Sequence, residues 1–175
     1  WLDAGLAGPD LVMSVNLSAG RLVEPTLAER IAAQVRDCGF DPGSLILEIT
    51  ESAILTDNDT TVRNLSALRA IGVRIALDDF GTGYSTFSHL DRLQIDIVKI
   101  DKSFVQTAGA GNTNSLAAAM VQLAGTLGYQ TIAEGIENAA QEEALRDLGC
   151  GLAQGYHLGR PLDAEAATRL LASSD

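Results

Sequence analysis

The segment "RIALDDFGTGYS" (residues 74–85) joins an apolar run to two adjacent acidic residues and then to a glycine-rich turn. The run is typical of a buried strand, where the like charges of Asp78 and Asp79 would repel each other strongly unless water or a cation lay beside them. Neighbouring strand residues point to opposite faces, so both carboxylates can reach one site only where the chain leaves the strand. Gly81 and Gly83 provide the backbone freedom for that departure. An Asx turn or a helix cap would explain one of these acids but not both.

Five further apolar runs are rich in Val, Ile and Leu and nearly continuous, which is typical of strands buried on both faces. They are "LVMSVNLS" (11–18), "SLILEIT" (44–50), "IDIVKID" (95–101), "QTIAEGI" (130–136) and "LAQGYHL" (152–158). Amphipathic stretches predict helices between most of these strands, at residues 26–39, 59–72, 113–128 and 138–149. The connection between "LDDFGTGYS" and "IDIVKID", residues 86–94, has room for only a brief helix. This alternation predicts a single α/β domain with a parallel sheet.

Local signals mark the ends of the predicted helices. Thr26 and Glu29 fit a capping box at the start of the first helix. The four helices end at glycines that suit left-handed C-terminal caps: Gly39, Gly72, Gly128 and Gly149.

Polar or acidic residues stand at the C-terminal end of every predicted strand. They are Asn16, Glu48, Asp78 with Asp79, Asp101, Glu134 and Gln154. An open doubly wound sheet would collect its chemistry at one switch point, whereas every strand of a (β/α) barrel delivers residues to one mouth. The absence of a GxGxxG turn also argues against a dinucleotide-binding fold. We therefore expect a TIM-like barrel, and because six strands do not close an eight-stranded one, we expect this chain to lack its first two strands.

The composition limits the partners of the chain. Its 175 residues carry a net charge of −11, which gives no general attraction to nucleic-acid polymers or to anionic membranes. An anionic substrate would need local positive charge from metal ions or from a few placed side chains. Cys38 and Cys150 do not form a disulfide or zinc pattern, so we expect reduced thiols and a cytoplasmic location, either free or as the cytoplasmic part of a membrane-anchored protein.

The polar strand ends form a set of oxygen donors, which are the ligands that Mg²⁺ and Mn²⁺ prefer. Lys99 and Asp101 are two residues apart and so share one face of their strand. Both would be costly to bury unless they pair with each other, as a structural ion pair, or meet a ligand. Taken singly, Glu48 could be a surface acid or a cap, and Asn16 could form an Asx turn.

Six motifs in order make this chain similar to one family. The segments "SVNLSA", "LEITES", "LDDFGTGYS", "VKID", "AEGIE" and "AQGYHLGRPL" resemble the signature segments of EAL-domain cyclic-di-GMP phosphodiesterases, over about residues 10–162. The resemblance implies a modified TIM barrel that hydrolyses cyclic di-GMP to linear pGpG with two Mg²⁺ or Mn²⁺ ions. Residues 1–175 would then be the C-terminal part of one such domain, roughly three quarters of it, with no second domain.

The resemblance also implies roles for individual positions. The implied metal ligands are Asn16, Glu48, Asp78, Asp79 and Glu134. The implied catalytic residues are Lys99, which would hold the nucleophilic water, together with Asp79, Glu134 and Gln154. The implied substrate-binding residues are Asn16, Asp101, Gln154 and Gly155. Glu51, Gly81 and Gly83 would anchor the "DDFGTGYS" loop, and Glu137 lies in the "AEGIE" loop.

One departure from the family is the missing Glu-Ala-Leu segment, where this chain has only "WLDAGLAGPD". We interpret this as truncation rather than decay, because every later motif is intact. Two other functions stay open: a sensor that binds cyclic di-GMP without hydrolysing it, and a barrel enzyme in which Lys99 abstracts a proton while acids hold Mg²⁺. The family resemblance further implies a homodimer and upstream regulatory domains in the parent protein.

Overall fold

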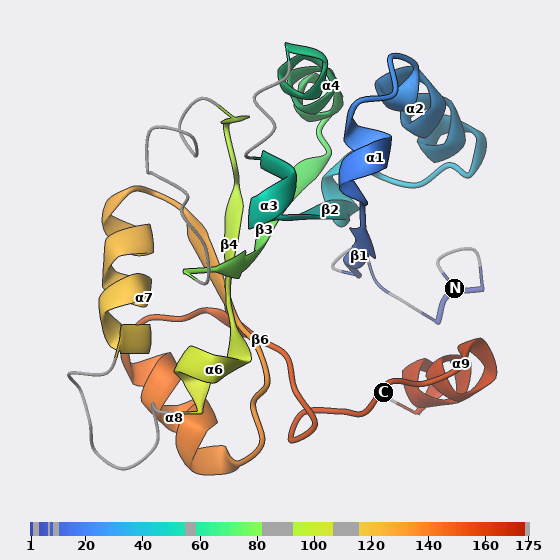
Figure 1. Cartoon of the computed structure of the whole chain (residues 1–175). Helices are drawn as coiled ribbons and strands as arrows, with labels where there is room; N and C mark the ends of the chain where they lie inside the picture. Colours follow the sequence, from blue (N-terminus) through green and yellow to red (C-terminus); the bar gives the residue numbers. More distant parts are fainter. Residues whose placement is uncertain are drawn as a thin grey trace.

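The computed structural model describes residues 1, 4–6, 8, 11–54, 59–81, 93–106 and 116–173. Six parallel strands pair in chain order within a single sheet. The strands are β1 (Met13–Asn16), β2 (Leu45–Thr50), β3 (Arg74–Phe80), β4 (Ile97–Ile100), β5 (Gln130–Ala133) and β6 (Leu152–Ala153). The sheet curls from β1 to β6, with the longer helices on its outside, as in part of a barrel (Figure 1). The predicted parallel α/β architecture is therefore confirmed.

Four helices lie where the amphipathic stretches predict them. They are α2 (Leu27–Asp37), α4 (Asp59–Ala70), α7 (Leu116–Thr126) and α8 (Ala139–Asp147). The sequence pattern did not predict the short elements or the C-terminal helix. These are α1 (Ala19–Leu22), the 3₁₀ turn η1 (Pro42–Ser44), α3 (Glu51–Ile54), α6 (Lys102–Val105) and α9 (Ala164–Ala172). The brief helix expected within residues 86–94 falls largely outside the described residues.

Side chains alternate between two faces of the sheet. Leu47, Leu77 and Val98 belong to the large core that also contains residues of the surrounding helices. The opposite face, called the inner face below, carries a separate small cluster that consists of Ile46, Ala76, Ile97 and Ile132. Because the side-chain period of a strand is two, the next residues on the inner face are those two positions further along each strand.

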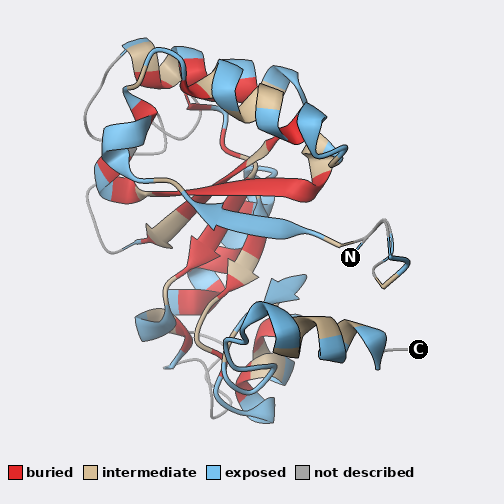
Figure 2. Ribbon diagram, turned by 90° about the vertical axis from the view of Figure 1, so that its right-hand side faces the viewer, coloured by how far each residue is buried: buried red, intermediate tan, exposed pale blue. Residues whose placement is uncertain are grey.

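The two edge strands differ from the prediction that all strands are buried on both faces. All four residues of β1 and both residues of β6 are exposed, whereas β4 is buried throughout (Figure 2). Strands β1 and β6 are the two edges of the sheet, so each pairs with only one other strand. Their side chains have no neighbouring strand on the other side to pack against. An apolar run in the sequence therefore predicted strand formation correctly but not burial.

The helix ends test the predicted caps. Gly39, Gly72, Gly128 and Gly149 all have positive φ, between 63° and 101°, which confirms the left-handed C-terminal caps. The capping box is wrong: Thr26 precedes α2, but its side chain makes no capping hydrogen bond. Its ψ of 7° lies outside the extended region that an N-cap side chain requires. The N-cap side chains that do accept a backbone N–H precede other helical turns and belong to Asp41, Asp101, Asn138 and Asp163.

Candidate active site

Four charged side chains lie on the inner face, one step beyond the small apolar cluster. Glu48 follows Ile46 on β2, Asp78 follows Ala76 on β3, and Lys99 follows Ile97 on β4. Glu134 comes two residues after Ile132, just past β5. Parallel pairing brings these C-terminal strand ends to one edge of the sheet, as the sequence predicts for a barrel mouth.

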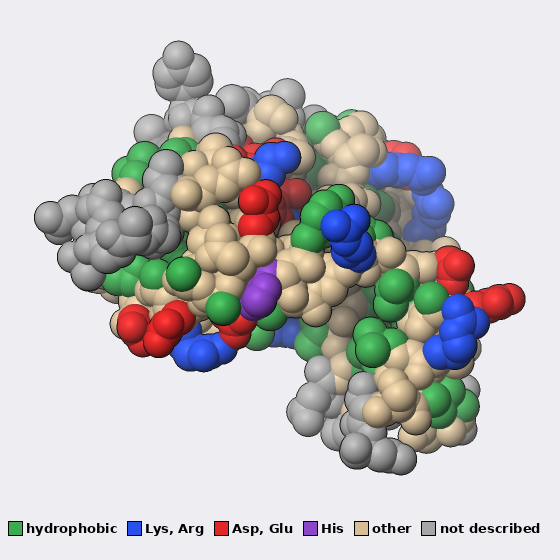
Figure 3. Space-filling view, turned by 90° about the horizontal axis from the view of Figure 1, so that it is seen from below, with side chains coloured by type: hydrophobic (Ala, Val, Ile, Leu, Met, Phe, Trp, Pro, Cys, Tyr) green, Lys and Arg blue, Asp and Glu red, His purple; other side chains and the backbone are tan. Residues whose placement is uncertain are grey.

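Lys99 lies at the centre of these acids. Its Nζ is 2.7 Å from Glu48 Oε2, 2.9 Å from Asp78 Oδ1 and 2.5 Å from Glu134 Oε1. The residue is only 2% exposed, and Glu48 is 7% exposed. In the space-filling view, acidic side chains lie directly beside a Lys or Arg side chain near the middle of one face (Figure 3). One buried ammonium therefore holds carboxylates from three different strands.

These contacts govern the protonation of Lys99. Burial lowers its pKa, but the hydrogen bonds to Glu134, Glu48 and Asp78 outweigh burial and raise the pKa above its ordinary value. A lysine that abstracts protons near neutral pH needs a lowered pKa. The three ion pairs therefore favour the charged form of Lys99 in this structure.

For two of the acids, Glu134 and Asp79, burial is the largest influence on the pKa and raises it. Burial raises the pKa of Glu134, and its hydrogen bond to Lys99 counters this effect while the charges of Asp78 and Glu48 add to it. Burial also raises the pKa of Asp79, and repulsion from Asp78 adds to that shift. Three carboxylates that repel one another around one ammonium still leave net negative charge at this edge of the sheet.

Asp78 and Asp79 reach the site by a route that differs from the predicted one. Strand β3 continues to Phe80, and its register with β4 shifts between Leu77 and Phe80. Asp79 itself has a φ of 56°, a left-handed conformation that is uncommon outside glycine. The chain thus turns at Asp79 inside an irregular strand rather than only at the following glycines. Gly81 also has positive φ, 94°, while Gly83 lies outside the described residues.

The donor atoms of this edge fit a hard divalent cation. Asp78, Asp79 and Glu134 each offer a carboxylate oxygen, and these atoms lie within 4.8 Å of one another. Ligand oxygens about 2.1 Å from an octahedral Mg²⁺ ion lie about 3.0 Å apart when adjacent and about 4.2 Å apart when opposite, so the three oxygens would move closer together to share one ion. The residues present therefore suit the metal that the sequence predicts.

Of two further predicted residues, Gln154 lies beside Glu134 and Asp101 lies near Asp79. Gln154 Nε2 donates a 2.8 Å hydrogen bond to Glu134 Oε1. Asp101 affects the pKa of Asp79 but uses its own carboxylate to cap α6, where it accepts hydrogen bonds from the backbone and hydroxyl of Ser103. Of the two alternatives left open for Lys99 and Asp101, an ion pair or a ligand, the ion pair is not present: Asp101 caps α6, and Lys99 pairs with three other acids.

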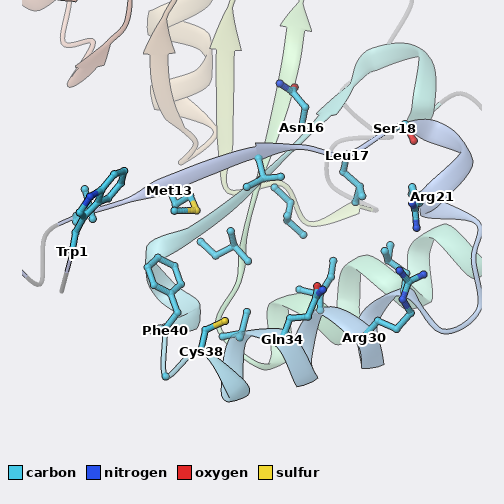
Figure 4. A pocket seen from close by; sticks show the side chains of 18 residues that line it. Trp1, Met13, Asn16, Leu17, Ser18, Arg21, Arg30, Gln34, Cys38 and Phe40 are labelled. Atoms are coloured by element: carbon cyan, nitrogen blue, oxygen red, sulfur yellow. The ribbon is translucent and has the colours of Figure 1, made fainter. Parts of the chain in front are cut away.

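Asn16 pairs in register with Glu48 but is exposed at the sheet edge. Its side chain points away from the apolar groove between β1 and α2, whereas Met13 points toward that groove (Figure 4). The two residues lie on opposite faces of β1, so Asn16 belongs to the inner face with the acids.

The two predicted loop glutamates differ in burial. Glu51 is 5% exposed at the start of α3, and its charge contributes to the raised pKa of Asp79. Glu137 is exposed.

Sequence reasoning missed Ser14. Its hydroxyl donates a hydrogen bond to Glu48 Oε1, so Glu48 is held by Ser14 on one side and by Lys99 on the other. Ser14 lies two residues before Asn16 on the same face of β1. The alternation of polar and apolar residues within "MSVN" could have revealed it.

Comparison with known proteins defines the class of protein. Residues 2–161 match the EAL domain family. The chain belongs to this family.

Particular relatives are similar over nearly the whole chain. The bifunctional diguanylate cyclase/cyclic di-GMP phosphodiesterase MucR of Pseudomonas aeruginosa is 41% identical over 174 residues, which are 99% of this chain and 25% of MucR. The EAL domain of Mycobacterium smegmatis DcpA has a TM-score of 0.88 and 38% identity, over 97% of this chain and 77% of that one. The manganese/cyclic-di-GMP complex of Klebsiella pneumoniae BlrP1 has a TM-score of 0.76 and 31% identity. This similarity covers 89% of this chain and 40% of the BlrP1 chain. The chain spans about a quarter of the length of MucR.

Among the described residues, no helix combines the length and the apolar character that crossing a membrane requires.

Proposed function

We propose that this chain carries the active site of a phosphodiesterase that hydrolyses cyclic di-GMP to linear pGpG. The observation that carries the proposal is the convergence of Glu48, Asp78 and Glu134 on Lys99 at the C-terminal ends of four parallel strands. Relatives named as cyclic-di-GMP phosphodiesterases support the substrate.

The acids on the inner face would hold the cofactor. We assign two divalent ions, Mg²⁺ or Mn²⁺, to the ligands Asn16, Glu48, Asp78, Asp79 and Glu134. When bound, such ions supply positive charge to the phosphodiester and make an attacking water more acidic. The oxygen-only donor set and the manganese complex of BlrP1 support this assignment.

The other side chains would position the reactants. Lys99 provides a positive charge beside these carboxylates, and its ammonium can hold a water or a phosphate oxygen. Gln154 donates a hydrogen bond to one oxygen of Glu134, and its side-chain carbonyl would orient water or phosphate. Asp101, Gly155 and Asn16 border this edge and would contact the substrate, and Glu51 with Gly81 and Gly83 would anchor the loop that follows Asp79.

The reaction adds one water molecule across one P–O ester bond. The oxygen of water bonds to phosphorus, the sugar oxygen leaves and takes a proton, and the ring of cyclic di-GMP opens. A homodimer and additional regulatory domains in the parent protein are parts of the same proposal, as is the location in the cytoplasm.

The test is hydrolysis in ¹⁸O-labelled water. The protein, treated with EDTA and then supplied with MgCl₂ or MnCl₂, should convert cyclic di-GMP to pGpG that carries one ¹⁸O atom in its terminal phosphate. Without added metal, no product should form. The measurement should be made on this chain and on the full-length gene product, and tight binding without product in the full-length protein would replace the hydrolase with the sensor.

A further inference from the structure

The carboxylates that would bind a cation are already shared with a side chain of the protein. Asp78 and Glu134 belong to the group of oxygen donors within 4.8 Å of one another. The same two residues contact Lys99 Nζ at 2.9 and 2.5 Å. An ammonium hydrogen and a metal ion both approach the lone pairs of carboxylate oxygens, and each carboxylate offers about four of these, so the two cations would share the same two carboxylates at close range.

Lys99 also pairs with Glu48 at 2.7 Å, and it cannot move away from the acids into water because it is 2% exposed. A divalent ion bound to Asp78 and Glu134 would lie within a few ångströms of the ammonium. Like charges at that distance repel strongly where water is excluded. Binding the ion must therefore weaken or break at least one of the three ion pairs.

Resting on the function proposed above, we propose that Lys99 is the built-in counter-ion of this metal site: it stabilises the carboxylate cluster in the absence of divalent ions and competes with their binding. The role follows from thermodynamic linkage. Lys99 stabilises the carboxylate cluster more when no metal is bound than when one is bound. This difference in free energy reduces the affinity of the cluster for the ion. Removing the ammonium should consequently tighten metal binding while it weakens the unloaded fold.

The chain offers a matched control. It contains two lysines, Lys99 and Lys102, and Lys102 is exposed at the start of α6. Lys102→Gln removes the same charge from the same region without touching the three carboxylates. Two variants of the buried lysine, Lys99→Met and Lys99→Gln, remove the charge and keep most of the side-chain volume.

The experiment titrates each protein with MnCl₂ and MgCl₂ alone and measures binding by calorimetry and unfolding by thermal melts. We expect Lys99→Met and Lys99→Gln to bind Mn²⁺ at least about tenfold more tightly than the wild type. We also expect a lower melting temperature without metal and a larger upward shift with metal. Lys102→Gln should match the wild type within about threefold. A variant that folds only when Mn²⁺ is present would show the same linkage in its extreme form.

Unchanged or weaker metal binding in both Lys99 variants would overturn the inference, because Lys99 would then support the ion rather than oppose it. Failure of the wild type to bind either ion would overturn both the inference and the proposed function. If the affinities shift as expected but cyclic di-GMP is not hydrolysed in any context, the proposed function fails and the role of Lys99 stands.

Discussion

Gly155 lies so close to the backbone of Ile136 that a Cβ atom added to it would be 2.2 Å from both the nitrogen and the oxygen of Ile136. Hydrogen bonds fix this contact on both sides. Ile136 donates its N–H to Gln154 O, and His157 donates its N–H to Ile136 O. The turn after β6 is thereby fastened to the loop after β5, which sets Gln154 beside Glu134.

This contact predicts that Gly155→Ala disrupts the site by displacing the backbone that carries Gln154. Backbone atoms cannot yield as a flexible side chain can, so the variant should lose about 1–3 kcal/mol of unfolding free energy. Displacement of Gln154 and Glu134 should also lower hydrolysis on the order of 100-fold. Urea unfolding and product formation measure the two effects. Gly151→Ala is the control, because an added Cβ there meets nothing within 4 Å; equal effects of both changes would contradict the structure.

Asn64 predicts a stability effect without a role in chemistry. Its Nδ2 donates hydrogen bonds of 2.8 and 2.9 Å to the carbonyl oxygens of Leu22 and Glu24, and the residue is 4% exposed. Asn64→Ala would leave both oxygens without this donor and should cost about 1–3 kcal/mol. Denaturant midpoints check the value. The exposed Ser66→Ala, on the same helix, should stay within about 0.5 kcal/mol. If Asn64→Ala lowers the unfolding free energy as little as Ser66→Ala does, then the hydrogen bonds of Asn64 do not hold α1 in place.

Asp101 predicts a pH dependence of stability. Its hydrogen bonds from the hydroxyl and backbone of Ser103 lower the pKa of the carboxyl in the folded chain. Because the pKa of Asp101 is lower in the folded chain than in the unfolded chain, its ionised form stabilises the fold. This stabilisation is fully present above the unfolded pKa of about 3.9 and disappears as the pH falls through the folded pKa.

Asp101→Asn keeps a capping side chain and removes the charge. The wild type should be more stable than this variant at pH 7, by about 0.3–1 kcal/mol from the charge at the helix N-terminus, and the difference should shrink below about pH 4. Urea unfolding between pH 3 and pH 7 measures it. Asp147→Asn, at the exposed end of α8, corrects for the change in net charge. A difference that stays constant with pH would mean that the charge of Asp101 does not act through Ser103.

Much of the fold could be predicted because each long element carries its own periodicity. The runs at residues 44–50 and 130–136 and the glycine that ends each long helix are local features, and the structure contains them. Four-residue helices such as α1 and α6 are too short to show a period of 3.6 residues. The sequence pattern also does not distinguish an edge strand from a central one, so the exposure of β1 was missed.

The candidate site followed from the same alternation, since Glu48, Asp78 and Lys99 fall on one face of neighbouring strands. Its partners did not follow. Lys99 was expected to pair with Asp101 or a ligand, but it pairs with acids 51, 21 and 35 positions away in the chain, a result of sheet curvature that no local pattern contains. Likewise, the positive φ of Asp79 depends on the shifted register between β3 and β4.

The most direct test of the proposed function is the turnover of cyclic di-GMP by the wild type and by Asp78→Asn, with Glu143→Gln on the exposed face of α8 as control. Asp78 contacts Lys99 and belongs to the metal-binding group, so its loss should reduce pGpG formation with Mn²⁺ by at least about 100-fold. Melting temperatures should be measured to check that both variants fold. The wild type and the control should form product, and Asp78→Asn should form almost none. Equal turnover by all three proteins would contradict it.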